Sequence, residues 1–280
     1  MIEIKTLKDA RTLFDSIKSH AIMVEKAYID SYSKKDLYCS YCMKITSIFS
    51  NLNPNAWTDL RGELKCVECN LTNRDRLFYN SLKFCAISDT QSGLIFERVT
   101  NLFDKLNQKF TLRGVEFGGY NYQSGETFFK NDTKLEHQNI ENTSFTDSTF
   151  DYVLHCDVLE HVNNPYAAIN DCLRVLKTNG TLLFSAPIYS GQIGDKTTAI
   201  LDESNEVKFL GDEMYHGDPL SDKGVPVFTL FGIDLIERLN KKGFACSYLF
   251  DYSIYEGILS NNNPYDVGHM WPIVVKIKKI

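Results

Sequence analysis

Residues 150–187 read FDYVLHCDVLEHVNNPYAAINDCLRVLKTNGTLLFSAP, and this stretch decides the fold. Tyr152–Cys156 has the short, mostly apolar character of a buried strand. Pro165 suits the first turn of a helix, where its missing N–H costs nothing. That helix should run to about Lys177 and stop at the turn Asn179-Gly180, and Thr181–Ala186 should form the next strand. The stretch therefore predicts a strand–helix–strand unit of a parallel sheet, at a place where such sheets hold a nucleotide-type cofactor.

The rest of the chain extends this alternation. Apolar residues at helical spacing over 6–28 predict an amphipathic N-terminal helix, and a second helix is expected over 71–82. Alternating strands and helices predict an α/β, Rossmann-like fold with a doubly wound, mostly parallel, seven-stranded sheet. We expect its further strands at 84–88, 111–117, 134–138, 245–252 and 272–277, and its helices at 94–106 and 231–242.

Composition excludes some functional classes. The chain has 280 residues, of which 43% are hydrophobic and 24% are charged, as in ordinary globular proteins. Its net charge of −6 argues against a broad nucleic-acid surface, which needs a basic face. The longest apolar runs are too short to cross a bilayer, and the N-terminus lacks the layout of a signal peptide. We therefore expect a cytoplasmic protein without membrane association.

Four of the eight cysteines stand in two CxxC pairs, Cys39/Cys42 and Cys66/Cys69. Two such pairs predict a tetrahedral zinc site, because each forms a tight turn that presents two thiolates. Four cysteine ligands leave no open position, so the metal would be structural. We expect an N-terminal helix and zinc-ribbon-like module over 1–82 and a second domain over 83–280. The other cysteines are expected to be small buried apolar residues: Cys85, Cys156, Cys172 and Cys246.

Several motifs in the second domain resemble the class I S-adenosylmethionine-dependent methyltransferases of the type 11 kind. They are Phe150-Asp151, Asp157–Val162, Arg174–Lys177 and Gly180. Two further stretches, together with the CxxC pairs, are similar to a bacterial subfamily with a zinc-ribbon-like N-terminus; they are Tyr215–Pro219 and Phe231–Leu235. The resemblance implies S-adenosylmethionine as the cofactor, structural Zn²⁺, and methyl transfer as the activity.

Such methyltransferases usually carry a glycine-rich turn after the first strand. Val115–Gly119 resembles that turn, but the interval from Gly119 to Asn139 is too short for the elements that would have to follow. We therefore place the first strand at 84–88 and the cofactor loop at Asp89–Gly93. A single glycine in this loop departs from the family pattern.

The remaining cofactor residues follow from this assignment. Glu116 would end the second strand, where an acidic residue accepts hydrogen bonds from both ribose hydroxyls; an exposed glutamate at a strand end is the alternative. Gly118 would let the chain turn beneath the ribose. The predicted cofactor-binding residues are Asp89, Gly93, Glu116, Phe117, Gly118, Asn139, Ile140, Cys156 and Asp157.

The acceptor side is predicted from the segment Tyr215–Pro219, which follows the fifth strand. His216 is the candidate general base, Asp218 would orient the acceptor, and Tyr215 would stack or donate. Gly-Asp-Pro is also strong turn chemistry, which is the structural alternative. Glu160-His161 lies near the expected cofactor as well, although such a pair more often stabilises a helix start.

Three functions fit these observations. The first is methyl transfer to a small polar acceptor, such as a saccharide or nucleotide-linked precursor. The second is an RNA-modifying methyltransferase that docks through the zinc ribbon, which the acidic charge balance disfavours. The third is a non-catalytic S-adenosylmethionine-binding or interaction protein, which the glycine-poor loop suggests. The acceptor and the oligomeric state stay open.

Overall fold

The computed structural model describes residues 1–30, 35–49, 59–130, 132–218, 220–262 and 268–280. It divides into two compact units, each assembled from separate stretches of chain. Unit 1 comprises residues 1–87, 188–193 and 232–275, and unit 2 comprises residues 88–187, 194–231 and 276–280. Unit 1 thus contains the whole predicted N-terminal module, together with later segments of the chain. The division at residue 82 stays a prediction.

The main sheet has seven strands in the order β1-β18-β21-β10-β9-β5-β6. Within unit 2, β9 pairs in parallel with both β10 and β5, and β5 pairs in parallel with β6. Within unit 1, β1 pairs antiparallel with β18. The sheet is therefore mixed, and the expected α/β Rossmann-like class with seven strands is confirmed.

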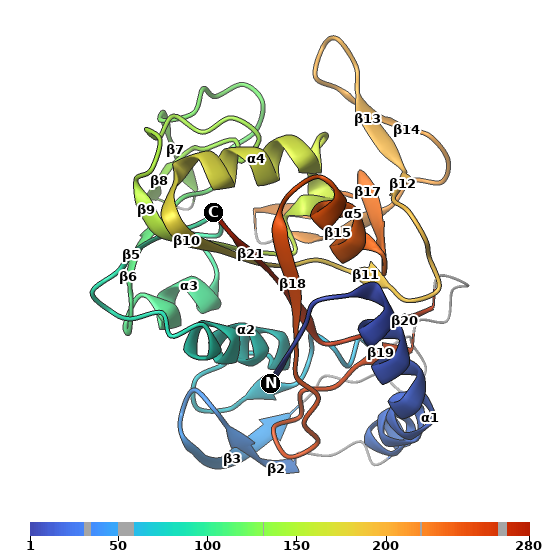
Figure 1. The fold of residues 1–280 in the computed structure, drawn as a ribbon. Coiled ribbons are helices and arrows are strands. Elements are labelled where there is room, and N and C mark those ends of the chain that lie inside the picture. The colour runs from blue at the N-terminus through green and yellow to red at the C-terminus, as the bar shows by residue number, and fades with distance from the viewer. Residues whose placement is uncertain (31–34, 50–58, 131, 219, 263–267) are drawn as a thin grey trace. The chain divides into compact units, whose positions relative to one another are not determined.

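Unit 2 carries the strand–helix–strand stretch (Figure 1). The helix α4 begins at Pro165, which is preceded by the capping side chain of Asn164, and packs against β10. The elements of this unit are β5 (Ser92–Ile95), α3 (Asn101–Leu106), β6 (Thr111–Gly114), β7 (Thr127–Lys130), β8 (Thr133–Glu136), β9 (Phe150–Cys156), the 3-10 turn η1 (Leu159–His161), α4 (Pro165–Val175), β10 (Leu176–Ser185), β12 (Lys196–Thr197), β13 (Ala199–Leu201), β14 (Val207–Phe209), β15 (Tyr215–Asp218), β16 (Ser221–Pro226) and β17 (Thr229–Gly232).

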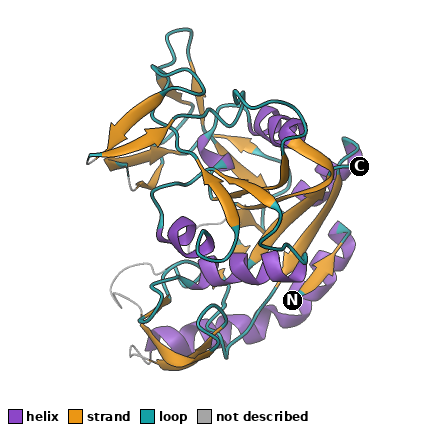
Figure 2. Ribbon diagram, turned by 90° about the vertical axis from the view of Figure 1, so that its left-hand side faces the viewer, coloured by secondary structure: helices purple, strands orange, loops and turns teal. Residues whose placement is uncertain are grey.

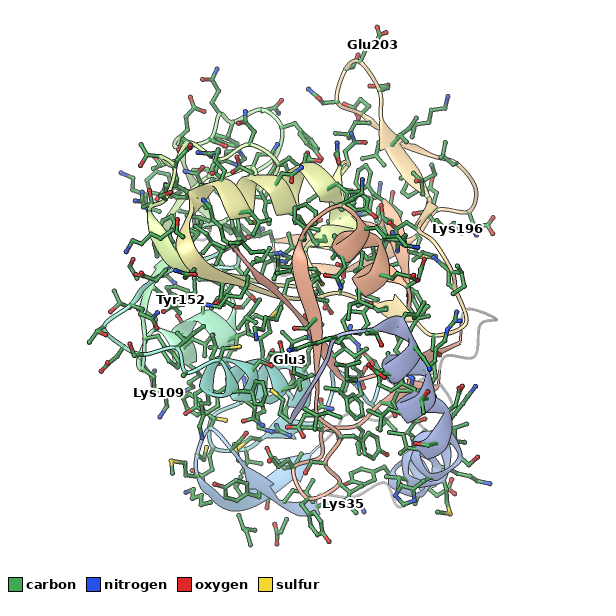
Figure 3. All side chains as sticks on the ribbon, in the orientation of Figure 1. Glu3, Lys35, Lys109, Tyr152, Lys196 and Glu203 are labelled. Carbon is green, nitrogen blue, oxygen red and sulfur yellow. The ribbon has the colours of Figure 1, made fainter. Side chains whose placement is uncertain are left out.

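The first strand of the parallel sheet is β5, which corrects the sequence assignment. Residues 84–88 form no strand, because α2 continues to Phe84, and the predicted helix over 94–106 begins only at Asn101. Gly93 lies inside β5, opposite Tyr152 of β9 (labelled in Figure 3). A Cβ atom on Gly93 would lie 2.1 Å from Cε2 of the Tyr152 ring. This glycine therefore allows close packing of two strands and does not belong to a loop.

The predicted strand over 134–138 also takes a different place. Its equivalent, β8, pairs antiparallel with β7 in a separate two-stranded sheet. It is linked to the parallel strands by the bridge between Glu116 and His137, next to β8, and by the ion pair between Arg113 of β6 and Glu136. The seventh strand of the main sheet is instead β1, at the opposite edge.

Unit 1 begins with β1 and leads directly into the long helix α1 (Figure 2). Thr72 and Asp75 form a capping box at the start of α2, because each side chain accepts a hydrogen bond from the other's backbone. The elements of this unit are β1 (Ile2–Ile4), α1 (Leu7–Asp30), β2 (Lys35–Cys39), β3 (Lys44–Phe49), β4 (Lys65–Cys66), α2 (Asn73–Phe84), β11 (Ile188–Tyr189), α5 (Leu235–Lys241), β18 (Ala245–Phe250), β19 (Asn261–Asn262), β20 (His269–Met270) and the first half of β21 (Ile273–Lys278).

Among the helices in the described residues, none combines the length and the apolar character that crossing a membrane requires. Three of the four cysteines outside the CxxC pairs are buried as expected, and Cys85 is half-buried.

Candidate cofactor and metal sites

Glu116 lies at the carboxyl end of β6, beside the loop that follows β5. Its Oε2 accepts a hydrogen bond from the Val99 N–H at 3.3 Å. Because β5, β6 and β9 are parallel, their carboxyl ends meet at one edge of the sheet, where α/β folds hold nucleotides. The predicted ribose-binding carboxylate is therefore at the edge where it was expected.

The loop after β5 is Phe96–Thr100, which corrects the predicted cofactor loop. Asp89 precedes β5 and thus lies at the opposite, amino end of the parallel strands. The loop contains no glycine. Phe96 and Glu97 are buried, while the Arg98 guanidinium lies over the Phe103 ring at 4.4 Å. Three backbone N–H groups of the loop already have partners: those of Phe96 and Arg98 donate to the Leu154 and Val115 carbonyls, and that of Val99 donates to Glu116.

The turn after Glu116 is held by a histidine that the sequence analysis did not single out. The Gly118 N–H donates to Nδ1 of His137 at 2.9 Å, and Phe117 lies against the same ring. Burial lowers the pKa of His137, which favours the neutral ring that can accept this hydrogen bond. A Cβ atom on Gly118 would lie 2.8 Å from the Phe128 ring, so this glycine permits a close approach.

Asn139 and Ile140 follow the bridge between Glu116 and His137. The Asn139 N–H donates to Ser124 Oγ at 3.0 Å, and its Oδ1 accepts from the Glu141 N–H at 3.0 Å. Ile140 is buried. Burial raises the pKa of Glu141, and a hydrogen bond between the Asn139 side chain and the Glu141 carboxyl group opposes this larger effect by lowering it. An amide can present both donors and acceptors to a base.

Asp157 directly follows β9 and has an unusual backbone. Its φ of +50° lies in the left-handed region, which residues other than glycine rarely adopt. Ser185 holds it there, because the Asp157 N–H donates to the Ser185 carbonyl at 3.0 Å and the Ser185 hydroxyl donates to Asp157 Oδ1 at 2.7 Å. Cys156, just before it, is buried. Backbone of this kind gathers at ligand sites, where the surrounding structure maintains it.

His216 of β15 lies beside Glu160 and His161 of η1. Their possible ligand atoms all lie within 4.8 Å of one another. Oε1 of Glu160 is 3.6 Å from Nε2 of His161 and 3.9 Å from Nδ1 of His216. The side chain of Glu160 is 1% exposed, whereas that of His216 is 33% exposed. Burial lowers the pKa of His161 to about 4. The pair Glu160-His161, which the sequence analysis left with a packing role, thus joins the predicted base in one polar cluster.

The two other predicted acceptor-side residues share β15 with His216. The Tyr215 ring lies 5.4 Å from that of Phe209 and below the Lys223 ammonium, and its hydroxyl donates to Glu213 at 3.4 Å. The backbone of Asp218 pairs with Ser221, and the side chain of Asp218 lies outside the described structure. Tyr215 is therefore not part of the histidine cluster.

The four paired cysteines converge in unit 1. The Sγ atoms of Cys39 and Cys69 are 3.7 Å apart, and those of Cys42 and Cys66 are 3.9 Å apart. A tetrahedron with Zn–S bonds of about 2.3 Å has edges of about 3.8 Å, so the four thiols already stand at ligand spacing. Cysteine thiolates are the donors that structural zinc prefers, and the residues present therefore fit this ion.

Both cysteine pairs are closed by the same local turn. The Met43 N–H donates to the Cys39 carbonyl, and the Asn70 N–H donates to the Cys66 carbonyl, each at 2.8 Å. Both donors have a positive φ, 56° for Met43 and 60° for Asn70. The repeated geometry shows two equivalent knuckles that face each other across the cluster.

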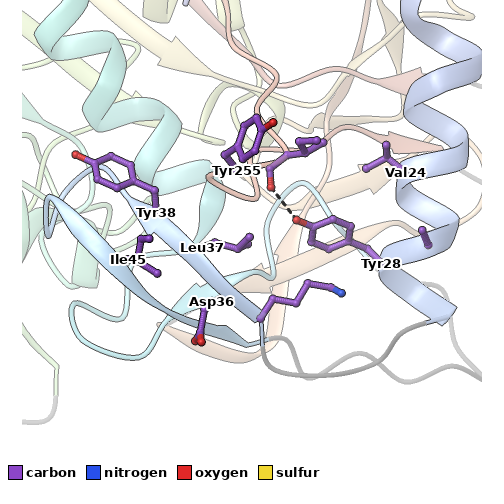
Figure 4. Close-up of a pocket in the computed structure, with 10 residues that line it drawn as sticks. Val24, Tyr28, Asp36, Leu37, Tyr38, Ile45 and Tyr255 are labelled. Atoms are coloured by element: carbon purple, nitrogen blue, oxygen red, sulfur yellow. Dashed lines mark hydrogen bonds between the residues drawn. The ribbon is translucent and has the colours of Figure 1, made fainter.

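A separate pocket in unit 1 is lined mainly by apolar and aromatic side chains, among them Val24, Leu37 and Ile45 (Figure 4). At one side the Tyr28 hydroxyl donates to the Ile254 carbonyl at 2.9 Å. The pocket contains none of the predicted cofactor, acceptor or metal residues.

The fold and the polar edge of unit 2 define a Rossmann-like domain of the nucleotide-cofactor type. Residues 96–184 match the family described as "Methyltransferase domain", beginning just after β5 and ending within β10. The chain therefore carries a methyltransferase domain of the class I S-adenosylmethionine-dependent kind and a four-cysteine cluster near its N-terminus, as the resemblance implied. Comparison with curated proteins gave no match.

Several solved structures are similar to the chain at low identity. A methyltransferase from Methanosarcina mazei has 14% identity and a TM-score of 0.40, with 71% of this chain and 97% of that one covered. The 1,6-didemethyltoxoflavin-N1-methyltransferase of Burkholderia thailandensis has 10% identity and a TM-score of 0.43, with 74% and 78% covered. A candidate sarcosine dimethylglycine methyltransferase from Galdieria sulphuraria has 17% identity and a TM-score of 0.33. That match covers 41% of this chain and 47% of the other, about half of its length.

Proposed function

We propose that this protein transfers a methyl group from S-adenosylmethionine to a small polar acceptor, such as a saccharide or a nucleotide-linked precursor. The observation that carries the proposal is the placement of Glu116 and Asp157 beyond the carboxyl ends of the parallel strands β6 and β9, with Asn139 two residues after the bridge between Glu116 and His137. Glu116 has a carboxylate for two ribose hydroxyls, and Asn139 has an amide for the adenine. Ile140 and Phe117 would add apolar contacts, and Cys156 and Asp157 would lie under the methionine portion.

S-adenosylmethionine supplies an electrophilic methyl group when it is bound. The protein must then orient the acceptor and, for a hydroxyl or amine, remove a proton. His216 is the proposed proton acceptor, because its side chain is one-third exposed and lies near the buried carboxylate of Glu160. That negative charge would stabilise the protonated imidazole. Asp218 is proposed to orient the acceptor, and Tyr215 to contact it from the same strand.

The four-cysteine cluster is proposed to hold a structural zinc ion. Its thiols stand at ligand spacing in the described structure, and four cysteines would leave the ion no open position for substrate. The proposed role of the zinc is therefore to stabilise unit 1 and not to take part in methyl transfer.

A non-catalytic binding protein is the second candidate, and one specific observation favours it. The loop Phe96–Thr100 has no glycine, whereas the family usually brings bare backbone against the cofactor there. Titration with S-adenosylmethionine separates the two functions. A catalytic protein binds the cofactor and turns it over, and failure to bind it at millimolar concentration would remove both the cofactor and the methyl-transfer proposal.

The sharpest test is Glu116→Ala, followed by calorimetric titration with S-adenosylmethionine. Loss of one charged hydrogen bond to the ribose, which contributes about 1.5–3 kcal/mol, should weaken binding about 10- to 100-fold, and loss of both should weaken it further. Glu116→Gln, which keeps the shape and one acceptor, should lose less. Glu203→Ala at an exposed position (labelled in Figure 3) is the control and should bind as the parent protein does. Equal affinity of the Glu116→Ala and parent proteins would contradict the ribose assignment.

A further inference from the structure

The side chains of Glu160, His161 and His216 together offer ligand atoms for a metal ion, and the methyl-transfer proposal gives His161 no role. This cluster combines one carboxylate and two imidazoles from two separate segments, η1 and β15. The carboxylate is almost completely buried, and the side chain of His161 is 11% exposed. Two histidines and one carboxylate, gathered on one side of a partly open position, form a common ligand set for divalent transition metals.

A backbone carbonyl sets the orientation of the His161 ring. Nδ1 of His161 lies 2.8 Å from the carbonyl oxygen of Pro226, which can only accept, so Nδ1 carries the hydrogen. In the neutral ring Nε2 then presents its lone pair, and it does so toward Oε1 of Glu160 at 3.6 Å. Histidines that ligate metals usually donate their other N–H to a carbonyl or carboxylate in this way. Two lone pairs that face each other are stabilised by a cation between them.

His216 completes the set from the exposed side. Its Nδ1 lies 3.9 Å from the same Glu160 oxygen, and the two imidazole rings stand edge to face with centroids 5.0 Å apart. Metal bonds of about 2.1 Å place neighbouring donor atoms about 3.0–3.4 Å apart. The donor atoms of the cluster, which lie within 4.8 Å of one another, would therefore have to move closer on binding. The one-third exposure of His216 leaves a route by which an ion can enter.

We propose that Glu160, His161 and His216 bind a divalent transition-metal ion, such as Zn²⁺, Co²⁺ or Ni²⁺. Three protein ligands leave coordination positions open for an oxygen or nitrogen of the methyl acceptor, whose proton the ion makes more acidic. This role rests on the proposed function, whereas metal binding itself does not. His216 is then a metal ligand and not the proton acceptor, and the two roles exclude each other.

Isothermal titration of tag-free protein with Ni²⁺ at pH 7.5 tests the binding, with zinc retained in the cysteine cluster. We expect one further site in the parent protein, its loss in Glu160→Gln, and at least tenfold weaker binding in His216→Ala. His20→Ala changes an exposed histidine of α1 and should bind Ni²⁺ as the parent does. Zinc content of every variant is measured alongside, so that loss from the cysteine cluster is recognised.

The outcomes separate the metal site from the methyl-transfer function. Equal Ni²⁺ binding by the parent and His216→Ala proteins would overturn the proposed metal site. His216→Ala is the decisive variant because the His216 side chain is partly exposed, so its removal disturbs folding less than a change at buried Glu160. S-adenosylmethionine affinity is measured on the same samples. If the protein binds S-adenosylmethionine but no Ni²⁺, the metal site is refuted and the proposed function still stands. If it binds Ni²⁺ but no S-adenosylmethionine, only the proposed function is refuted. If methyl transfer continues unchanged after the ion is removed from this cluster, the ion has no role in acidifying the acceptor. His216 then remains the proposed proton acceptor.

Discussion

Replacing Arg76 with methionine should destabilise unit 1 and weaken the proposed binding of zinc by its four-cysteine cluster. Arg76 lies in α2 and is fully buried, with a relative exposure of 0%. Its guanidinium donates to three backbone carbonyls, those of Leu64, Leu71 and Glu256, at 2.8–3.1 Å. Burial lowers the pKa of Arg76, and the negative charge of the nearby cysteines opposes that shift. The guanidinium thus links two loops and would compensate negative charge on the four-cysteine cluster when it holds a metal.

The expected loss follows from these contacts. Each hydrogen bond from a charged donor contributes about 1.5–3 kcal/mol, and the three carbonyls would be left buried without this donor. Part of that loss is recovered, because the charge no longer has to be buried. We therefore expect a decrease of about 3–5 kcal/mol in the free energy of unfolding, as for other broken buried ion networks. Removal of a group that supports metal ligands typically weakens metal affinity about 10- to 100-fold.

Two measurements check this prediction. Urea unfolding followed by tryptophan fluorescence gives the change in stability, and competition with a chromogenic chelator gives the zinc affinity. Lys83→Met is the matched control, because Lys83 lies on the same helix with an exposed side chain. Arg76→Lys keeps the charge but cannot reach three carbonyls, so it should lie between the parent and Arg76→Met. Parent-like unfolding and zinc release in Arg76→Met would refute the structural role of this guanidinium.

Three further predictions concern unit 2 and the cysteine knuckles. Gly93→Ala should lower stability by about 1–3 kcal/mol in urea unfolding, because the added methyl group meets the Tyr152 ring, whereas Gly211→Ala in open space should not. His155 is fully buried with its pKa lowered to about 3, so the native state cannot take up the proton that the unfolded state binds below about pH 6.5. Stability contributed in this way is present above pH 6.5 and is lost as the pH falls toward 3. In His155→Phe, the free energy of unfolding should therefore fall less steeply with decreasing pH, by about 1.4 kcal/mol per pH unit. An unchanged slope between pH 6 and 4 would contradict this prediction. Cys42→Ser should abolish stoichiometric zinc in metal analysis, while Cys85→Ser, outside the cluster, should retain it.

Elements with strong local signals were predicted correctly from the sequence. The N-terminal helix follows from its apolar spacing, and the structure has it as α1. Pro165 and the preceding Asn164 mark the start of α4, because a proline at the first helical position and an asparagine cap act through the adjacent residues alone. The CxxC pairs predicted the cysteine cluster for a similar reason, since each knuckle is a turn of a few residues.

The errors arose where one apolar pattern permits two structures. The run Leu94–Leu106 has helical spacing, yet its first residues belong to the buried strand β5. A short buried strand and a buried helix turn cannot be distinguished by periodicity alone. That error placed the predicted cofactor loop at Asp89–Gly93, whereas the loop that follows β5 is Phe96–Thr100, and Asp89 lies before β5 at the amino end of the strands. Glu116 was unaffected, because its position depends on β6, which was recognised independently.

The sequence by itself determined the class of fold, the cysteine ligand set and the strand–helix–strand stretch. Each depends on interactions between residues that are close along the chain. Only the tertiary structure showed that β1 pairs with β18 at the edge of the sheet and that β8 forms a separate hairpin. Only the tertiary structure brought His216 to Glu160 and His161, which lie in a separate segment. Such contacts depend on packing and strand register across the whole unit, and no local pattern of residues encodes them.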